Sequence, residues 1–250
     1  MELYWTMFFF LIGITFGSFF NVVGLRVPKN IPFTSDRSYC PYCKTQLKWY
    51  ELIPVFSYIF LFGKCRTCKR RISPLYPIVE LLTGLLFAYS YVVFGFHVEL
   101  FAAIVFISLL MIIFVTDLKY MLIPNKILLF FLPLVIVARM ISPLTPWYDA
   151  MIGGVVGFLL IAIIILVSKG GMGAGDMKLF GIIGLILGWQ HTLLTFFLAA
   201  LFGAIVGGVL LFFKIIKRKQ PIPFGPYIVI GAIISYFYGK DIISLYLTLL

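Results

Sequence analysis

The sequence is poor in charged side chains, and this scarcity excludes a soluble protein. Only 12% of its 250 residues are Asp, Glu, Lys or Arg, whereas 62% are hydrophobic. A soluble domain has about 25% charged residues and about 45–50% apolar residues. No soluble core needs so many apolar side chains. The composition therefore predicts an all-α polytopic membrane protein.

Acidic and histidine side chains are scarce as well, and several catalytic motifs that use them are missing. The chain has nine acidic residues and two histidines, His97 and His191. It contains no H-E-x-x-H zinc-protease motif and no G-x-S-x-G nucleophile elbow. It also lacks low-complexity segments and a convincing internal repeat. Chemistry based on histidine or on a serine nucleophile is therefore not expected.

Long apolar runs are abundant instead, and they predict about eight transmembrane helices. A helix needs about 20 apolar residues to cross a bilayer, and somewhat fewer when it is short or buried. The candidate spans are residues 3–25, 74–94, 99–116, 127–141, 148–168, 177–189, 192–213 and 224–238. The first run lacks a basic segment and a small-residue cleavage site, so a retained helix is expected. The expected domains are a first transmembrane helix at 1–25, a polar loop at 26–73 and a helical bundle at 74–250.

Positive charge is concentrated in alternate connections between these runs. The net charge is +11, and all but two of the 20 lysines and arginines fall in the connections of one side. The exceptions are Arg139 and Lys240. Because cytoplasmic loops carry an excess of Lys and Arg, this face is expected in the cytoplasm and both termini outside. The bases follow membrane topology, so no nucleic-acid partner is expected.

All four cysteines lie in the loop at 26–73. Cys40 and Cys43 form one C-x-x-C pair, Cys65 and Cys68 form a second, and 21 residues separate the two pairs. Two such pairs can supply the four thiolates of a tetrahedral zinc site, although this spacing lies just beyond the common range. Two disulfides or free thiols are the alternative, and a cytoplasmic loop disfavours the disulfides. The pattern favours structural Zn²⁺, because a four-sulfur site leaves no open position for catalysis.

An apolar segment at residues 49–62 separates the two cysteine pairs. It is too short and interrupted to span the membrane, yet too apolar to lie fully in water. It is expected either to lie at the membrane interface, with Trp49 and Tyr50 at headgroup level, or to cover the zinc knuckles. The residues leave both possibilities open.

Two isolated acids at the ends of apolar runs are the candidate catalytic residues. Asp117 ends one run, and Asp176 follows the glycine-rich stretch that includes Gly173 and Gly175, just before Lys178. Acids at the edge of hydrocarbon are costly and usually functional. Each acid alone could be a solvated helix-end residue, or one favoured by the helix macrodipole. Together, on one face of the membrane, they predict a pair that could share one proton in acid–base catalysis.

With these residues identified, the chain resembles the type IV prepilin peptidases, bifunctional leader peptidase/N-methyltransferases, along nearly its whole length. The matching segments are G-S-F-F-N-V-V from Gly17, R-V-P from Arg26, the two cysteine pairs with E-L-I-P from Glu51 between them, G-K-C-R from Gly63, Y-P-I-V-E-L-L-T-G from Tyr76, Asp117 with I-P-N from Ile123, G-A-G-D-M-K from Gly173, and P-F-G-P from Pro223. The acidic motif from Gly173 is of the G-x-G-D class of membrane aspartyl proteases, with Ala174 at its variable position.

The resemblance implies an activity and its participants. Asp117 and Asp176 would be the catalytic aspartates that remove the basic leader of type IV prepilin or pseudopilin precursors after a glycine, at the cytoplasmic face of a bacterial inner membrane. The new N-terminus would then be methylated with S-adenosylmethionine. Glu51, Gly63 and Lys64, which lie in the matched loop, are the candidates for the methyl-transfer site.

Two other classes of function compete with this interpretation. An ion-coupled secondary transporter also uses membrane acids beside a broken helix, but usually near the middle of the bilayer and within inverted repeats. A non-catalytic assembly factor of a pilus or secretion machine would need the acids only for structure. Substitution of the acids separates the three, since only a protease would lose cleavage.

Overall fold

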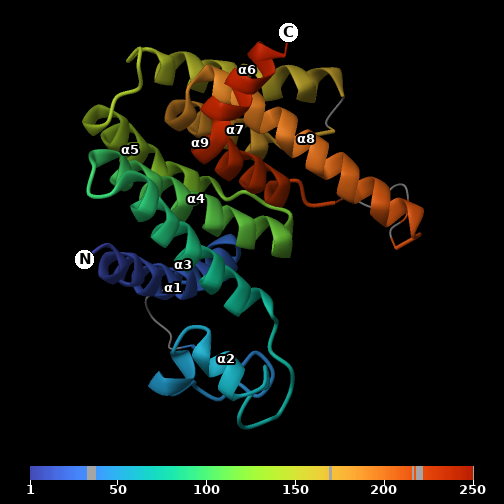
Figure 1. The fold of residues 1–250 in the computed structure, drawn as a ribbon. Helices are drawn as coiled ribbons and strands as arrows, with labels where there is room; N and C mark the ends of the chain where they lie inside the picture. The colour runs from blue at the N-terminus through green and yellow to red at the C-terminus, as the bar shows by residue number, and fades with distance from the viewer. Residues whose placement is uncertain (33–37, 169–170, 216, 218–221, 250) are drawn as a thin grey trace. The chain divides into compact units, whose positions relative to one another are not determined.

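The computed structural model describes residues 1–32, 38–168, 171–215, 217 and 222–249. It contains two compact units, Met1–Val115 and Thr116–Leu250 (Figure 1). Within the described residues the regular structure is helical, and the only extended pairings are two isolated bridges, Tyr39 with Gln46 and Lys64 with Arg71. The expected all-α class is confirmed.

The first unit is built on the close packing of α1 (Glu2–Arg26) against α3 (Leu75–Phe94). Glycines let the two helices approach. A Cβ atom on Gly13 would lie 2.7 Å from the Cα of Gly84, and one on Gly17 would lie 2.7 Å from the Cα of Glu80. Small residues allow such approaches between membrane helices. This contact sets the position of Glu80, which is discussed below.

The loop between α1 and α3 lies beyond one end of these two helices (Figure 1). It holds the short helices η1 (Val27–Lys29), η2 (Trp49–Leu52) and α2 (Phe56–Phe60). At five residues, α2 is far too short to cross a bilayer. Its neighbours Trp49 and Phe62 are 78% and 88% exposed. Such exposure of large apolar side chains favours contact with the membrane interface over burial around the cysteines.

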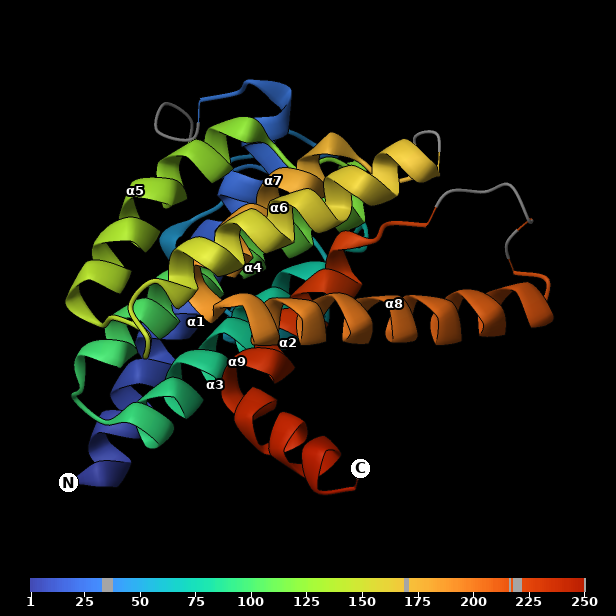
Figure 2. The ribbon, with the colours of Figure 1, turned by 90° about the horizontal axis from the view of Figure 1, so that it is seen from above.

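Helix α4 (Val98–Tyr120) leads into the second unit, which continues with α5 (Asn125–Ile141), α6 (Asp149–Val167), α7 (Ala174–Leu187), α8 (Trp189–Phe212) and α9 (Gly225–Thr248). Helices α6 and α7 lie side by side (Figure 2). Their contact depends on Gly153 and Gly184, because a Cβ on either residue would clash with the backbone of the other. The contact fixes α7, which carries Asp176.

Each of the eight expected spans is found as a helix, and six of them are long and apolar enough to cross a membrane: α1, α3, α4, α6, α8 and α9. Helices α5 and α7 have only 17 and 14 residues. Helix α9 continues ten residues beyond the expected end at 238. The expected span ends just before Gly239. In the structure this glycine is helical and packs against His191, where no side chain would fit.

Candidate active site and metal centre

Asp117 lies in the last turn of α4 and is only 6% exposed. Its Oδ2 atom accepts a hydrogen bond of 2.7 Å from the backbone N–H of Gly225, the first residue of α9. A Cβ atom on Gly225 would lie 2.7 Å from this same oxygen, so a side chain here would displace the carboxylate. The start of α9 therefore fixes the orientation of Asp117.

Asp176 lies in the first turn of α7, outside the six candidate spans. Its Oδ2 atom accepts a hydrogen bond of 3.0 Å from the backbone N–H of Gly173, the N-cap residue, so the carboxylate caps its own helix. Burial raises the pKa of Asp176 to about 6, although the Gly173 N–H opposes this shift. The negative charge of Asp117 raises the pKa further.

The glycine-rich start of α7 brings its first turn against the segment that follows Asp117. A Cβ atom on Gly175 would lie 2.8 Å from the Cβ of Ile123, a buried residue between α4 and α5. The structure thus places the two predicted aspartates near each other, each held by one backbone N–H. Such a pair can keep one proton between two carboxylates, as general acid–base hydrolysis requires.

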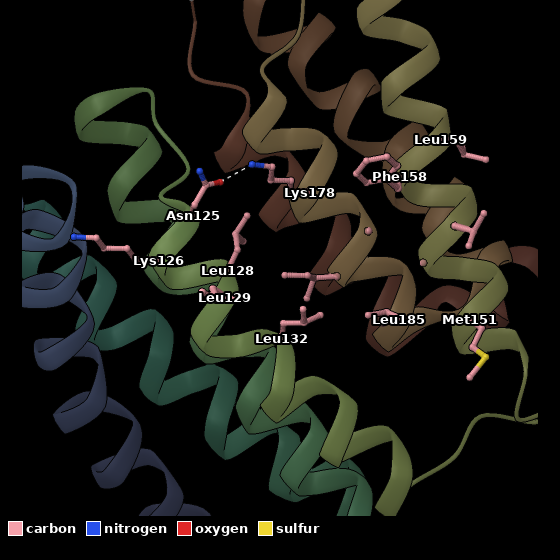
Figure 3. A pocket seen from close by; sticks show the side chains of 14 residues that line it. Asn125, Lys126, Leu128, Leu129, Leu132, Met151, Phe158, Leu159, Lys178 and Leu185 are labelled. Carbon is pink, nitrogen blue, oxygen red and sulfur yellow. Dashed lines mark hydrogen bonds between the residues drawn. The ribbon is translucent and has the colours of Figure 1, made fainter.

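Lys178 lies on a different face of α7 from Asp176. Successive helical residues are rotated by about 100°, so Lys178 lies nearly opposite Asp176 around the helix. Its Nζ atom donates a hydrogen bond of 2.9 Å to the Oδ1 atom of Asn125 (Figure 3). Both residues line an apolar cavity of about 960 Å³ between α5, α6 and α7. The lysine therefore joins α5 to α7 and does not pair with the aspartate that precedes it.

The four cysteines converge in the loop of the first unit. The Sγ atoms of Cys40 and Cys68 are 3.8 Å apart, those of Cys43 and Cys65 are 3.9 Å apart, and all four lie within 4.8 Å of one another. Four sulfurs at about 2.3 Å from a tetrahedral zinc ion are separated by roughly 3.8 Å. The four side chains therefore fit a zinc ion.

The pKa values of the clustered thiols also favour a cation at this position. Hydrogen bonds from Thr45 lower the pKa of Cys43 to about 6. Although the Arg70 amide lowers the pKa of Cys68, desolvation and the neighbouring thiols raise it to about 11. Four thiolates cannot coexist here unless a positive charge lies between them.

The three candidate methyl-transfer residues lie in different surroundings. Glu51 accepts a hydrogen bond of 2.7 Å from the backbone N–H of Lys48, and it lines a hollow of about 300 Å³ with aromatic neighbours that include Tyr50. Gly63 has a φ of +65°, and a Cβ atom there would lie 2.8 Å from the Tyr58 ring. Lys64 pairs with Arg71 in the turn before Cys65. Only Glu51 of the three lines the hollow.

Two residues, Gly225 beside Asp117 and Asn21 in α1, had no role of their own in the sequence analysis. Gly225 lies in the P-F-G-P segment, and nothing in the sequence relates it to an aspartate 108 residues earlier. Asn21 lies in the first matched motif, but it is polar rather than charged, and its type alone does not predict a functional role. A buried polar residue in an apolar run was the only available signal.

Comparisons with known proteins agree on one family. The chain matches the bacterial peptidase A24 N-terminal domain at residues 11–94 and the type IV leader peptidase family at residues 104–208. A Bacillus subtilis protein named prepilin leader peptidase/N-methyltransferase is 46% identical over 238 residues, which are 95% of this chain and 96% of that protein. Proteins with the same name from Xanthomonas campestris and Pseudomonas aeruginosa are each 34% identical, over 94% and 95% of this chain and 92% and 91% of their own length. No solved structure matches significantly.

Proposed function

The chain belongs to the type IV leader peptidase family, and from this premise we propose that Asp117 and Asp176 are its catalytic pair. The observation that carries the proposal is that both aspartates lie in the second unit, where the first turn of α7 packs against Ile123, six residues after Asp117. The substrates are type IV prepilin or pseudopilin precursors, and the bond cut is the one after the leader glycine. Family membership does not favour a carrier or a non-catalytic assembly factor.

The mechanism follows from the hydrogen bonds of the pair. We assign the acid role to Asp176, because a pKa of about 6 keeps part of its population protonated near neutral pH. Asp117, which accepts the Gly225 N–H, takes a proton from the attacking water as general base. Asp176 then donates its proton to the leaving amine. The pair ends the cycle with one proton, as it began.

The membrane orientation is part of the same proposal. The aspartates and nearly all bases lie on the face assigned to the cytoplasm of a bacterial inner membrane, with both termini outside. A precursor with a basic leader and an apolar helix presents its junction at that face. The expected division into 1–25, 26–73 and 74–250 then separates a first helix, a loop and a catalytic bundle. Lipid surrounds the bundle, and no nucleic acid takes part.

Methylation of the new N-terminus is the second proposed activity. S-adenosylmethionine would supply an electrophilic methyl group, with Glu51 in the aromatic hollow and Gly63 and Lys64 in the adjoining turn. Structural zinc bound by the four cysteines would hold this loop in shape. The described residues of the loop include few buried apolar side chains, so a metal would be its main source of stability.

The test is cleavage of a precursor-like substrate in membranes by Asp117→Asn and Asp176→Asn. Asparagine keeps the size of each side chain and removes the ionisable group, so we expect both variants to lose cleavage by at least about 1,000-fold. Asp149→Asn is the matched control, because Asp149 accepts a hydrogen bond from the start of α8. Undiminished cleavage by either of the first two variants would refute the aspartyl mechanism.

A further inference from the structure

A second buried carboxylate lies in the first unit. Glu80 is in α3 and only 7% exposed. Its Oε2 atom accepts a hydrogen bond of 2.7 Å from the backbone N–H of Val55, and the side chain of Ser18 in α1 is a second partner. Both partners donate hydrogen bonds, and no cation is among them. A carboxylate inside a membrane helix is costly and usually functional.

Asn21 in α1 contacts α3 one helical turn before Glu80. Its Nδ2 atom donates a hydrogen bond of 3.1 Å to the carbonyl of Tyr76, which also accepts the amide of Glu80 in the helical ladder. The side chain is 1% exposed. Its Oδ1 atom is the one buried side-chain nitrogen or oxygen without a hydrogen-bond partner in the described part of the chain. A buried acceptor without a donor is unfavourable unless a ligand supplies one.

Val55, whose backbone N–H donates a hydrogen bond to Glu80, has an unusual backbone conformation. Val55 has a φ of +62° and a ψ of −54°, and the Phe56 amide donates to the Pro54 carbonyl at 2.6 Å. These values describe a γ-turn of the rare, strained kind, centred on a β-branched residue. Strain of this sort collects at functional sites. The turn directs the Val55 N–H towards Glu80, and release of the hydrogen bond would let the turn relax.

We propose that Glu80 and Asn21 bind the free N-terminal amine of the cleaved substrate for methylation. The inference rests on the proposed N-methyltransferase activity, for which it adds an acceptor site. A carboxylate and an unpaired amide oxygen offer acceptors only, which suits a group that offers only N–H donors. In the absence of this amine, the Val55 N–H occupies the carboxylate.

Glu80 also supplies the base that the reaction needs. The ammonium group first gives one proton to the Glu80 carboxylate and becomes a neutral amine. The amine lone pair then forms the bond to the methyl carbon of the donor, and the carbon–sulfur bond breaks with its electrons left on sulfur. The products are a methylammonium group, a thioether and a protonated Glu80, so charge and atoms balance.

The test uses the full chain in nanodiscs and two peptides that begin with Phe and continue as an apolar helix. One peptide has a free N-terminus and the other is N-acetylated. We expect the wild type to bind the free amine at least about tenfold more tightly than the acetylated peptide. Glu80→Gln should lose this preference, although its amide oxygen can still accept the Val55 N–H. Asn21→Leu should lose part of it.

Controls separate amine binding from a purely structural role. Thr83→Val changes a buried side chain of α3 that hydrogen bonds only to its own helix, at 2.7 Å from the Val79 carbonyl, and it should keep the preference. Retained metal content would show that Glu80→Gln preserves the loop. The inference is overturned if the wild type does not discriminate between the peptides or if Glu80→Gln still does.

Turnover distinguishes this inference from the function on which it rests. We expect Glu80→Gln to cleave precursor within about twofold of the wild type and to methylate it at least about 100-fold more slowly. Normal methylation by Glu80→Gln would overturn the role of Glu80 as base. A wild type that cleaves but never methylates would instead overturn the proposed methyl transfer, and the peptide measurement would still decide whether the amine binds.

Discussion

The hydrogen bond between Gly225 and Asp117 leads to a quantitative prediction for Gly225→Ala. The added methyl group would lie 2.7 Å from both the Cβ and the Oδ2 atoms of Asp117 and 2.8 Å from Cγ. Ordinary contacts between such atoms need about 3.5 Å or more. Relief of the clash therefore moves the carboxylate by roughly 1 Å. A displacement of this size in a catalytic group costs about 100-fold in rate, which corresponds to about 2.7 kcal/mol in the activation free energy.

The assay for this prediction is cleavage of a precursor-like substrate, with kcat and KM determined separately. The loss should fall on kcat, because the methyl group displaces a reacting side chain and leaves the rest of the substrate surface unchanged. Gly208→Ala is the matched control, since a Cβ on this glycine of α8 would meet no atom within 4 Å. Thermal unfolding of both variants shows whether α9 remains packed. A folded Gly225→Ala variant with a kcat within threefold of the wild type would contradict the reasoning.

Two further predictions concern protonation and metal. Because folding raises the pKa of Asp176 from 3.8 to about 6, its contribution to stability is fully present below about pH 4 and is lost as the pH rises through 6. We therefore expect Asp176→Asn to have a smaller decrease in Tm between pH 4 and pH 7 than the wild type, and equal decreases would count against the buried carboxylate. Removal of zinc by a strong chelator should make the loop that contains Cys40 and Cys65 sensitive to limited proteolysis, with one metal ion per chain released. Cys40→Ser should show the same sensitivity without chelator, and protection of the loop in the metal-free protein would argue against a structural metal.

The sequence allowed prediction of the features in which a single residue type is rare. Four cysteines in two pairs predicted a cluster, and the structure brings their sulfur atoms together. Asp117 and Asp176 were candidates because so few acids interrupt the apolar runs. The lengths of the apolar runs predicted the helices, because a helix that crosses a bilayer needs about 20 apolar residues.

Backbone partners of the side chains could not be predicted in the same way. The Gly225 N–H that holds Asp117 comes from a distant part of the chain, and any residue except proline has such a group. The γ-turn at Val55 could not be predicted either, because a β-branched residue favours extended structure. Contacts of this kind depend on how the helices pack, and no local sequence pattern predicts them.

The shortness of α7 has a consequence for the supply of water. A helix of 14 residues is about 21 Å long, whereas the hydrocarbon core of a bilayer is about 30 Å thick. A helix shorter than the bilayer is accommodated by local thinning of the lipid, by snorkelling of its flanking residues or by packing against longer helices, and the second half of α7 is buried against its neighbours. Hydrolysis consumes one water molecule for each bond cut. Because the first turn of this short helix is partly exposed, we expect bulk solvent to reach the bond without a dedicated channel through the protein.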